Sequence, residues 1–149
     1  MKLLLQNKVA VITGSSRGIG AATALLLAQH GAKVVINYRS NRNKAQQIVK
    51  AIQENGGVAF AVQADVTKPK DIARLVNQSL NKFVRIDIWV NNVSDYTNPK
   101  KVTDVSWLDY QKELEGSVKS TLLCSQIVIP IMQKQKYGSV VVPAGEFIM

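Results

Sequence analysis

The sequence predicts an α/β fold in which a parallel β-sheet of about five strands carries helices on both faces. Short apolar runs rich in β-branched residues alternate with segments of a dozen residues or more whose apolar positions repeat at helical spacing. Turn residues separate the two kinds of segment, and the sequence contains no internal repeat or low-complexity linker. The length of 149 residues fits a single domain, 1–149, that can bury a sizeable core.

The first elements form a strand–helix–strand unit. The run 8–13 is short, apolar and β-branched, and turn residues follow it, which is typical of a buried strand. From Gly18 to His30 the apolar residues keep helical spacing, and Gly31 stands at the position that commonly ends a helix. The apolar run 33–38 then predicts the second strand.

The next elements repeat this alternation. Residues 41–55 carry one apolar stripe and lead into a pair of glycines, which predicts a helix and its end. Residues 58–62 form the third apolar run, and the helix expected at 69–83 again places its apolar residues on one face. Strands that alternate with such helices are joined by right-handed crossovers, so we expect the strands to be parallel.

The last elements include the longest helix. A fourth strand is predicted at 86–90, followed by a polar, loop-like stretch at 91–101. Ser106 and Asp109 have the spacing of a capping box, so they are expected to open a helix over 106–133. A fifth strand is predicted at 139–142.

Charge is unevenly distributed along the chain. The formal net charge is +9, and eight cations precede the first acid, Glu54. A basic segment of this kind is a solvated face, a site for an anionic ligand or a nucleic-acid surface. The sequence has neither a reader motif nor aromatic stacking platforms, so we expect no nucleic-acid partner.

Composition also restricts the class of protein. No apolar run approaches the ~20 residues that a membrane span needs, so no membrane association is expected. One cysteine excludes a disulfide scaffold, and the single histidine leaves no His-based metal site. We therefore expect a soluble, cytoplasmic protein without a metal.

A glycine-rich loop lies between the first strand and the first helix. It reads Thr-Gly-Ser-Ser-Arg-Gly-Ile-Gly over 13–20. Glycines allow a sharp turn there, let a pyrophosphate approach the backbone and let helix and strand pack closely. The helix N-terminus adds free N–H groups and a positive dipole end. The alternative is a tight turn that binds nothing, but the strand–turn–helix context favours a dinucleotide site of the Rossmann type.

This loop resembles the cofactor motif of the short-chain dehydrogenase/reductase family. Asp65-Val66 resembles the family's adenine-contacting pair, and Asn91-Asn92 resembles the start of its Asn-Asn-Ala-Gly motif. Pro130-x-Met132 and 138–141 resemble the end of its long helix and the strand that follows, so the likeness spans about 8–142. It implies a doubly wound sheet that binds a nicotinamide dinucleotide. The expected cofactor-binding residues are Gly14, Ser15, Ser16, Arg17, Gly18, Ile19, Gly20, Tyr38, Arg39, Ser40, Asp65, Val66, Asn91 and Asn92.

The end of the second strand indicates which dinucleotide is preferred. An acid usually binds a free ribose 2′-OH at this point, whereas a 2′-phosphate needs a cation. Tyr38 occupies the place of the acid, and Arg39 follows it. Arg17 can reach the same ribose, and Ser40 or Asn41 could donate hydrogen bonds. Arg binds two phosphate oxygens at once, so NADP(H) is preferred over NAD(H), the alternative being that Arg39 is merely solvated.

The resemblance also implies which residues should perform hydride transfer. In the family, a Tyr and a Lys four residues later act on the substrate oxygen, with a Ser after the fifth strand and an Asn on the long helix. Ser117 stands at the Asn position, and the Ser position falls near 144–145, which has no hydroxyl. The spacing Tyr96 to Lys100 lies in a loop and is not expected to be catalytic. The sequence ends at Met149, so no catalytic residue is predicted and the fold is expected to be C-terminally incomplete.

The resemblance is nearest to the 3-oxoacyl-acyl-carrier-protein reductase branch. It implies hydride transfer between NADPH and a small carbonyl or acyl-thioester substrate, with this chain binding the cofactor but turning over poorly or not at all. The alternative is a non-catalytic NADP(H)-binding or interaction module.

The long helix 106–133 is expected to mediate homo-oligomer contacts, as it does in the family. Its Cys124 has no His nearby and is interpreted as a packing residue. The apolar stripe comprises Trp107, Tyr110, Leu114, Val118, Leu122, Ile129 and Met132.

Overall fold

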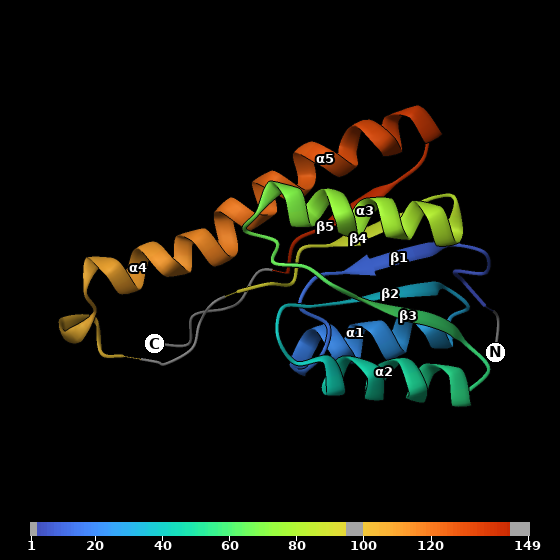
Figure 1. Ribbon diagram of the computed structural model, residues 1–149, viewed down its shortest axis with the longest axis horizontal. Coiled ribbons are helices and arrows are strands. Elements are labelled where there is room, and N and C mark those ends of the chain that lie inside the picture. The colour runs from blue at the N-terminus through green and yellow to red at the C-terminus, as the bar shows by residue number, and fades with distance from the viewer. Residues whose placement is uncertain (1–2, 95–99, 144–149) are drawn as a thin grey trace.

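The computed structural model describes residues 3–94 and 100–143 (Figure 1). Within these residues, five parallel strands form one sheet in the order β3-β2-β1-β4-β5. The strands are β1 Val9–Ile12, β2 Lys33–Tyr38, β3 Val58–Gln63, β4 Ile88–Val90 and β5 Ser139–Val141. The α-helices are α1 Gly18–Gln29, α2 Arg42–Glu54, α3 Pro69–Phe83, α4 Trp107–Leu114 and α5 Ser120–Gln135.

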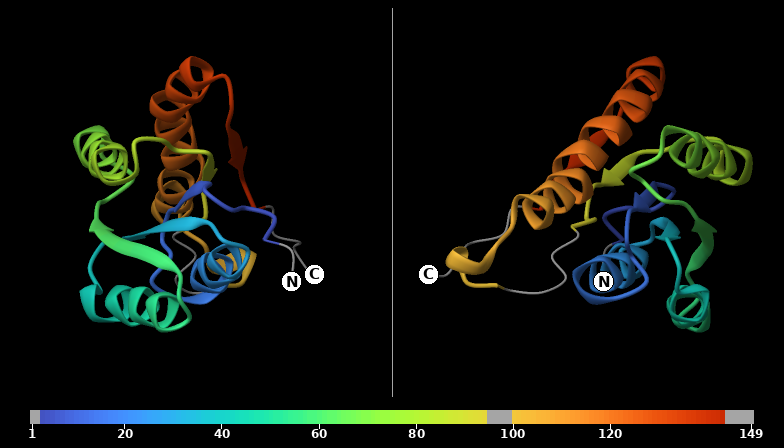
Figure 2. Two further views of the ribbon diagram at one scale, coloured as in Figure 1. Left: turned by 90° about the vertical axis from the view of Figure 1, so that its right-hand side faces the viewer. Right: turned by 60° about the vertical axis from the view of Figure 1, so that its left-hand side comes forward.

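Helices cover both faces of the sheet, which confirms the predicted doubly wound architecture. α1 and α2 lie on one face, and α3 and α5 lie on the other (Figures 1 and 2). Each layer has its own core: Ile36 and Ile52 belong to one cluster, Leu75 and Trp89 to the other. The central strands β1, β2 and β4 are almost wholly buried because both of their sides are covered, whereas the edge strand β5 is mostly exposed.

The direction of winding reverses at the centre of the sheet. β1 pairs with β2 on one side and β4 on the other, with Val11 opposite both Val35 and Trp89. The connections after β1 and β4 therefore leave in opposite directions, which opens a crevice at the carboxyl ends of these strands. This is where the glycine loop lies.

The fourth strand is shorter than predicted. It begins at Ile88 rather than at residue 86. Asp87 is fully buried, and its carboxylate accepts hydrogen bonds from the Val9 backbone and the Arg85 guanidinium. The side chain of Gln135 bonds both backbone groups of Ile86. The backbone of Asp87 still bonds Val9 and Ser139, so it is at Ile86 that side-chain bonds take the place of the ladder. The other elements lie within one or two residues of their predicted bounds.

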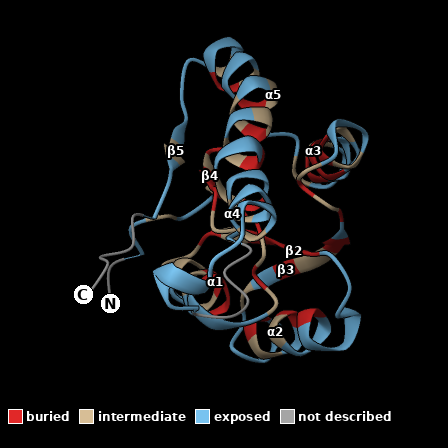
Figure 3. Ribbon diagram, turned by 90° about the vertical axis from the view of Figure 1, so that its left-hand side faces the viewer, coloured by how far each residue is buried: buried red, intermediate tan, exposed pale blue. Residues whose placement is uncertain are grey.

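The long helix is continuous but not uniform. The predicted capping box is present, since Ser106 and Asp109 bond each other's backbone N–H groups. A π-helical turn, Glu115–Lys119, joins α4 to α5, and the sequence pattern did not predict it. Figure 3 shows α4 mostly exposed, and Figure 1 shows that it projects beyond the sheet. No helix in the described part of the chain has the length and apolarity to cross a lipid bilayer.

Candidate dinucleotide-binding site

A cleft of about 470 Å³ lies at the carboxyl ends of β1 to β4. Four segments that are distant in sequence form it: the glycine loop, the start of α2, the residues after β3 and those after β4. The lining residues are Gly14, Ser16, Arg17, Gly18, Ile19, Asn37, Tyr38, Arg39, Ser40, Asn41, Lys44, Ala64, Asp65, Val66, Thr67, Asn92, Val93 and Ser94.

Eleven of the fourteen predicted cofactor-binding residues line this cleft. The other three, Ser15, Gly20 and Asn91, are buried around it. The hydroxyl of Ser15 donates to the Ile12 carbonyl at 2.7 Å and accepts from the Asn37 N–H at 3.1 Å. Ser15 therefore shapes the loop from beneath.

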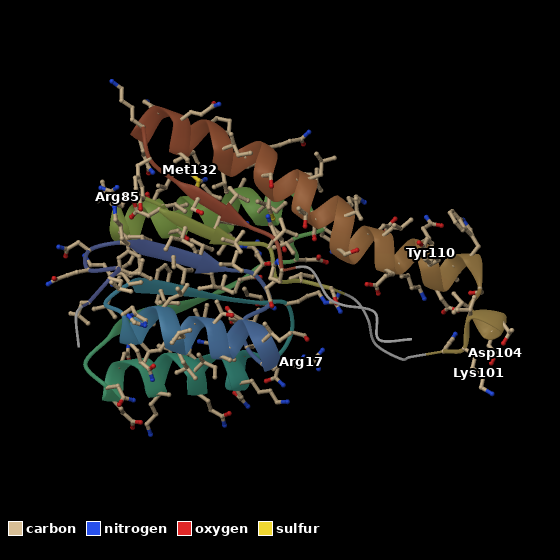
Figure 4. All side chains as sticks on the ribbon, turned by 180° about the vertical axis from the view of Figure 1, so that it is seen from behind. Arg17, Arg85, Lys101, Asp104, Tyr110 and Met132 are labelled. Atoms are coloured by element: carbon tan, nitrogen blue, oxygen red, sulfur yellow. The ribbon has the colours of Figure 1, made fainter. Side chains whose placement is uncertain are left out.

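The glycine loop leaves the start of α1 open to an anion. Gly14 and Gly18 have φ of 60° and 55°, a conformation that side chains other than Asn and Asp rarely adopt. The N-cap residue Arg17 makes no side-chain capping bond, and the first turn of α1 contains no acid. Figure 4 shows Arg17 projecting outward from this point. Uncapped N–H groups and the positive end of the helix dipole favour bound phosphate.

Gly20 permits close packing under the loop. A Cβ atom there would lie 2.5 Å from Nδ2 of Asn92 and 2.9 Å from the Gly14 carbonyl oxygen. Neither contact is possible for a real side chain, and the second is with backbone, which cannot move aside cheaply. The third glycine of the motif is thus required by packing.

Asn37 organises the loop, and sequence reasoning did not identify it. Its side chain accepts from the Gly14 N–H at 3.0 Å and donates to the Ala64 carbonyl at 3.0 Å. It is 1% exposed, so these bonds are shielded from water. The available signal was a polar side chain inside the otherwise apolar run 33–38.

Cations gather along the wall formed by the end of β2 and the start of α2. Arg39 and Lys44 line this wall, and Arg17 lines the cleft from the glycine loop. The N-cap Asn41 accepts from the Lys44 N–H at 3.0 Å, and the first turn of α2 has no acid. Lys44 was not among the predicted site residues. The feature that could have identified it is its place in the first turn of the helix that follows the second strand.

Asp65 is the one carboxylate among the described residues that line the cleft. Its Oδ1 accepts from the backbone and the hydroxyl of Thr67, at 3.1 and 2.7 Å. Burial opposes ionisation, but these bonds and the positive charges of Lys68 and Arg39 together lower the pKa of Asp65. The group is therefore a fixed anion at neutral pH that offsets part of the cationic wall.

The segment after β4 is tied to the end of β1. The Asn92 N–H donates to Oγ1 of Thr13 at 2.9 Å, and its Nδ2 donates to the Thr13 carbonyl at 3.0 Å. Asn91 is 6% exposed, and its Oδ1 accepts from the indole N–H of Trp89 at 2.9 Å. The two asparagines thus differ in role: Asn92 lines the cleft, whereas Asn91 is buried behind it.

A second, more apolar cavity of about 510 Å³ adjoins the first. It lies between the ends of β4 and β5 and the π-helical turn. Its described lining residues are Asn91, Asn92, Val93, Ser94, Ser117, Val118, Thr121, Leu122, Ser125, Val142 and Pro143. Ser117 donates its hydroxyl to the Glu113 carbonyl at 2.6 Å, so its proton is committed to the helix.

The other positions considered for catalysis fall elsewhere. Tyr96 and residues 144–145 lie outside the described residues. Lys100 forms an ion pair with Asp109, Nζ to Oδ2, at 2.8 Å. In the described part of the chain no cluster of His, Cys, Asp and Glu could hold a metal ion. Cys124 is fully buried, and burial raises the pKa of its thiol to about 12, in agreement with a packing role.

Comparison with known proteins identifies relatives over nearly the whole chain. The family model described as short chain dehydrogenase matches residues 8–144. A 3-oxoacyl-[acyl-carrier-protein] reductase from Synechocystis sp. is 40% identical over 137 residues, which is 92% of this chain and 55% of the relative. The chain thus spans about half the length of this relative.

Solved structures show the same architecture. A hydroxysteroid dehydrogenase from Escherichia coli superposes with a TM-score of 0.85 at 35% identity, covering 94% of this chain and 58% of that one. A 7α-hydroxysteroid dehydrogenase in complex with NADH and 7-oxo glycochenodeoxycholic acid gives a TM-score of 0.88 at 34% identity, covering 97% and 55%. The fold, the glycine loop and these matches agree, and this chain belongs to the short-chain dehydrogenase/reductase family.

Proposed function

We propose that this chain binds NADP(H) in the cleft at the carboxyl ends of β1 to β4. It would form the nucleotide-binding part of an oxidoreductase that transfers hydride between NADPH and a carbonyl substrate. The observation that carries the proposal is the cationic wall: Arg39 and Lys44 line the cleft beside the end of β2, with Tyr38 where an acid would bind a free ribose.

The cleft offers matching groups to each part of the cofactor. The pyrophosphate would lie over the glycine loop, where the uncapped start of α1 supplies N–H donors. Asp65 and Val66 would contact the adenine end. Arg39 would bind the 2′-phosphate through its planar fork, and Lys44 would add a second positive charge.

The apolar cavity is proposed to receive the nicotinamide and the substrate carbonyl. It adjoins the cleft at Asn92, so one extended ligand could occupy both. The relative from Synechocystis is named as a 3-oxoacyl-[acyl-carrier-protein] reductase, and the solved neighbour holds 7-oxo glycochenodeoxycholic acid. Both are carbonyl compounds, which supports this substrate class for the present family member.

The chain alone is proposed to turn over slowly. Proton transfer to the reduced carbonyl needs a group with a suitable pKa within hydrogen-bond reach. The described residues of the apolar cavity include no Tyr, Lys or His, and the Ser117 proton is held by the Glu113 carbonyl. The same observation favours a second candidate function, a non-catalytic NADP(H)-binding module.

Self-association is a further part of the proposal. Trp107, Tyr110 and Val118 are 71%, 54% and 60% exposed on the long helix. Met132 was predicted to belong to this stripe, but it is 7% exposed and points toward the sheet (Figure 4). An apolar helix surface of this kind favours a homo-oligomer. A cytoplasmic location is proposed from the composition and the single, buried thiol.

Fluorescence titration tests cofactor binding. We expect saturable binding of NADPH to the full chain. In Gly18→Asp, a carboxylate would stand at the start of α1, where nothing lies within 4 Å of an added Cβ. This variant should weaken NADPH binding at least about tenfold, since a negative charge there repels the pyrophosphate. No saturable binding by the unaltered chain would refute the proposal.

A second assay separates the enzyme from the module. NADPH oxidation is followed with an acetoacetyl thioester as substrate. Binding without measurable oxidation supports the non-catalytic module, whereas oxidation at a rate typical of reductases would show that this chain carries its own proton donor.

A further inference from the structure

The two cavities share a wall made of three consecutive residues. Asn92, Val93 and Ser94 line both the nucleotide cleft and the apolar cavity. A ligand that occupies both cavities must pass this segment, whereas a ligand confined to the cleft need not. The shape of the segment therefore affects the two kinds of ligand differently.

Val93 is the bulky, apolar member of this wall. Its N–H donates to Oγ1 of Thr13 at 3.2 Å, which fixes its backbone to the end of β1. Its side chain packs on the core cluster that includes Trp89. Asn92 on one side is held by three hydrogen bonds to the Thr13 and Gly14 region, so the wall cannot retreat without breaking them.

The Val93 side chain lies directly against the glycine loop. Its Cγ2 methyl would be 3.0 Å from a Cβ atom placed on Gly14, a distance tighter than ordinary van der Waals contact. Gly14 in turn is held by the bond from its N–H to Asn37. Both sides of this contact are thus anchored, and Val93 stands on the border that the two cavities share.

We propose that Val93 is a specificity-determining residue that restricts passage between the nucleotide cleft and the apolar cavity. The chain then favours the adenosine half of the cofactor relative to the complete dinucleotide. This inference rests on the proposed NADP(H) site. The adenosine 2′,5′-bisphosphate half would lie toward Arg39 and Lys44 and would not cross Val93, whereas the nicotinamide half would have to.

Calorimetric titration of two ligands tests this inference. NADPH and adenosine 2′,5′-bisphosphate are each titrated into the unaltered chain, Val93→Ala and Val93→Ile. Removing the methyl groups should tighten NADPH binding about fivefold, and adding one should weaken it by a similar factor. The dissociation constant of the bisphosphate should change less than about twofold in both variants. The ratio of the NADPH constant to the bisphosphate constant should therefore fall in Val93→Ala and rise in Val93→Ile.

Val140→Ala is the matched control. Val140 packs on the same core cluster from β5 and does not line either cavity. It should leave the ratio of dissociation constants unchanged, which separates passage width from loss of core packing. If the dissociation constants of both ligands changed in parallel, or if their ratio were unchanged in Val93→Ala, the proposed role of Val93 would be overturned. The proposed NADP(H) site would still stand. If the unaltered chain bound neither ligand, both the role of Val93 and the NADP(H) site would be overturned.

Discussion

The backbone N–H of Gly14 donates a hydrogen bond to Oδ1 of Asn37 across 3.0 Å, joining the glycine loop to the end of β2. The side-chain amide of Asn37 also donates, through Nδ2, to the backbone carbonyls of Val62 and Ala64. One buried side chain therefore connects the carboxyl ends of β1, β2 and β3. The conformation of the loop depends on this amide as well as on its glycines.

Replacing Asn37 with Ala should destabilise the fold strongly. The substitution leaves the Gly14 N–H and the Ala64 carbonyl without their partner in a buried environment, at a cost of about 2–4 kcal/mol. Urea unfolding followed by circular dichroism measures this cost. Asn43→Ala, on the exposed side of α2, is the control and should change the free energy of unfolding by less than about 0.5 kcal/mol. Equal effects of the two variants would contradict the role of Asn37.

Gly20→Ala should lower the free energy of unfolding more than a substitution at Gly18 does. The added methyl would meet the Gly14 carbonyl oxygen and Asn92, so the loop would have to shift at a cost of about 1–3 kcal/mol. Gly18→Asn has open space around its Cβ, and Asn adopts positive φ readily, so it should cost less than about 1 kcal/mol. Thermal unfolding compares them. The opposite order would show that packing under the loop is not what requires Gly20.

The capping box should give the start of α4 a pH dependence. Hydrogen bonds from Lys100 and Ser106 hold the pKa of Asp109 well below its ordinary value of 3.8. Because the folded-state pKa is depressed, the stabilisation is present above pH 3.8 and is lost as the pH falls through the folded value.

Asp109→Asn tests this dependence. Its unfolding temperature should be below that of the unaltered chain at neutral pH, and the difference should shrink as the pH falls below 3.8. A difference that stayed constant with pH would exclude ionised Asp109 as its source.

The thiol of Cys124 should be unreactive in the folded protein. Burial raises its pKa to about 12, so almost no thiolate exists at pH 8, and the sulfur has no solvent access. A disulfide reagent such as DTNB should label one thiol per chain in denaturant and essentially none under native conditions. Equal labelling rates in the two conditions would place Cys124 at the surface.

Much of the fold could be predicted because its signals are local. The apolar run 33–38 and the stripe of 41–55 each specify an element, and Gly56 with Gly57 ends the latter. The early start predicted for the fourth strand was wrong because the side chain of Gln135 bonds both backbone groups of Ile86, a tertiary effect.

The site could be predicted where backbone conformation requires particular residue types. Gly14 and Gly20 follow from turn geometry and close approach, and Arg39 follows from its place after the second strand. Asn37 and Lys44 were missed because their roles depend on neighbours that only the folded chain brings together. The partners of Asn37 lie on other segments, and only the fold places Lys44 of α2 along the cleft, so residue spacing alone does not reveal either role.

We propose that the cationic wall selects the 2′-phosphate of NADP(H). The most direct test is calorimetric comparison of NADPH and NADH with the full chain, Arg39→Ala and Arg42→Ala. We predict that the unaltered chain binds NADPH at least about tenfold more tightly than NADH, and that Arg39→Ala abolishes this preference. Arg42 does not line the cleft, so its replacement should preserve the preference. Equal affinities of the unaltered chain for NADPH and NADH would show that the cationic wall does not select the 2′-phosphate.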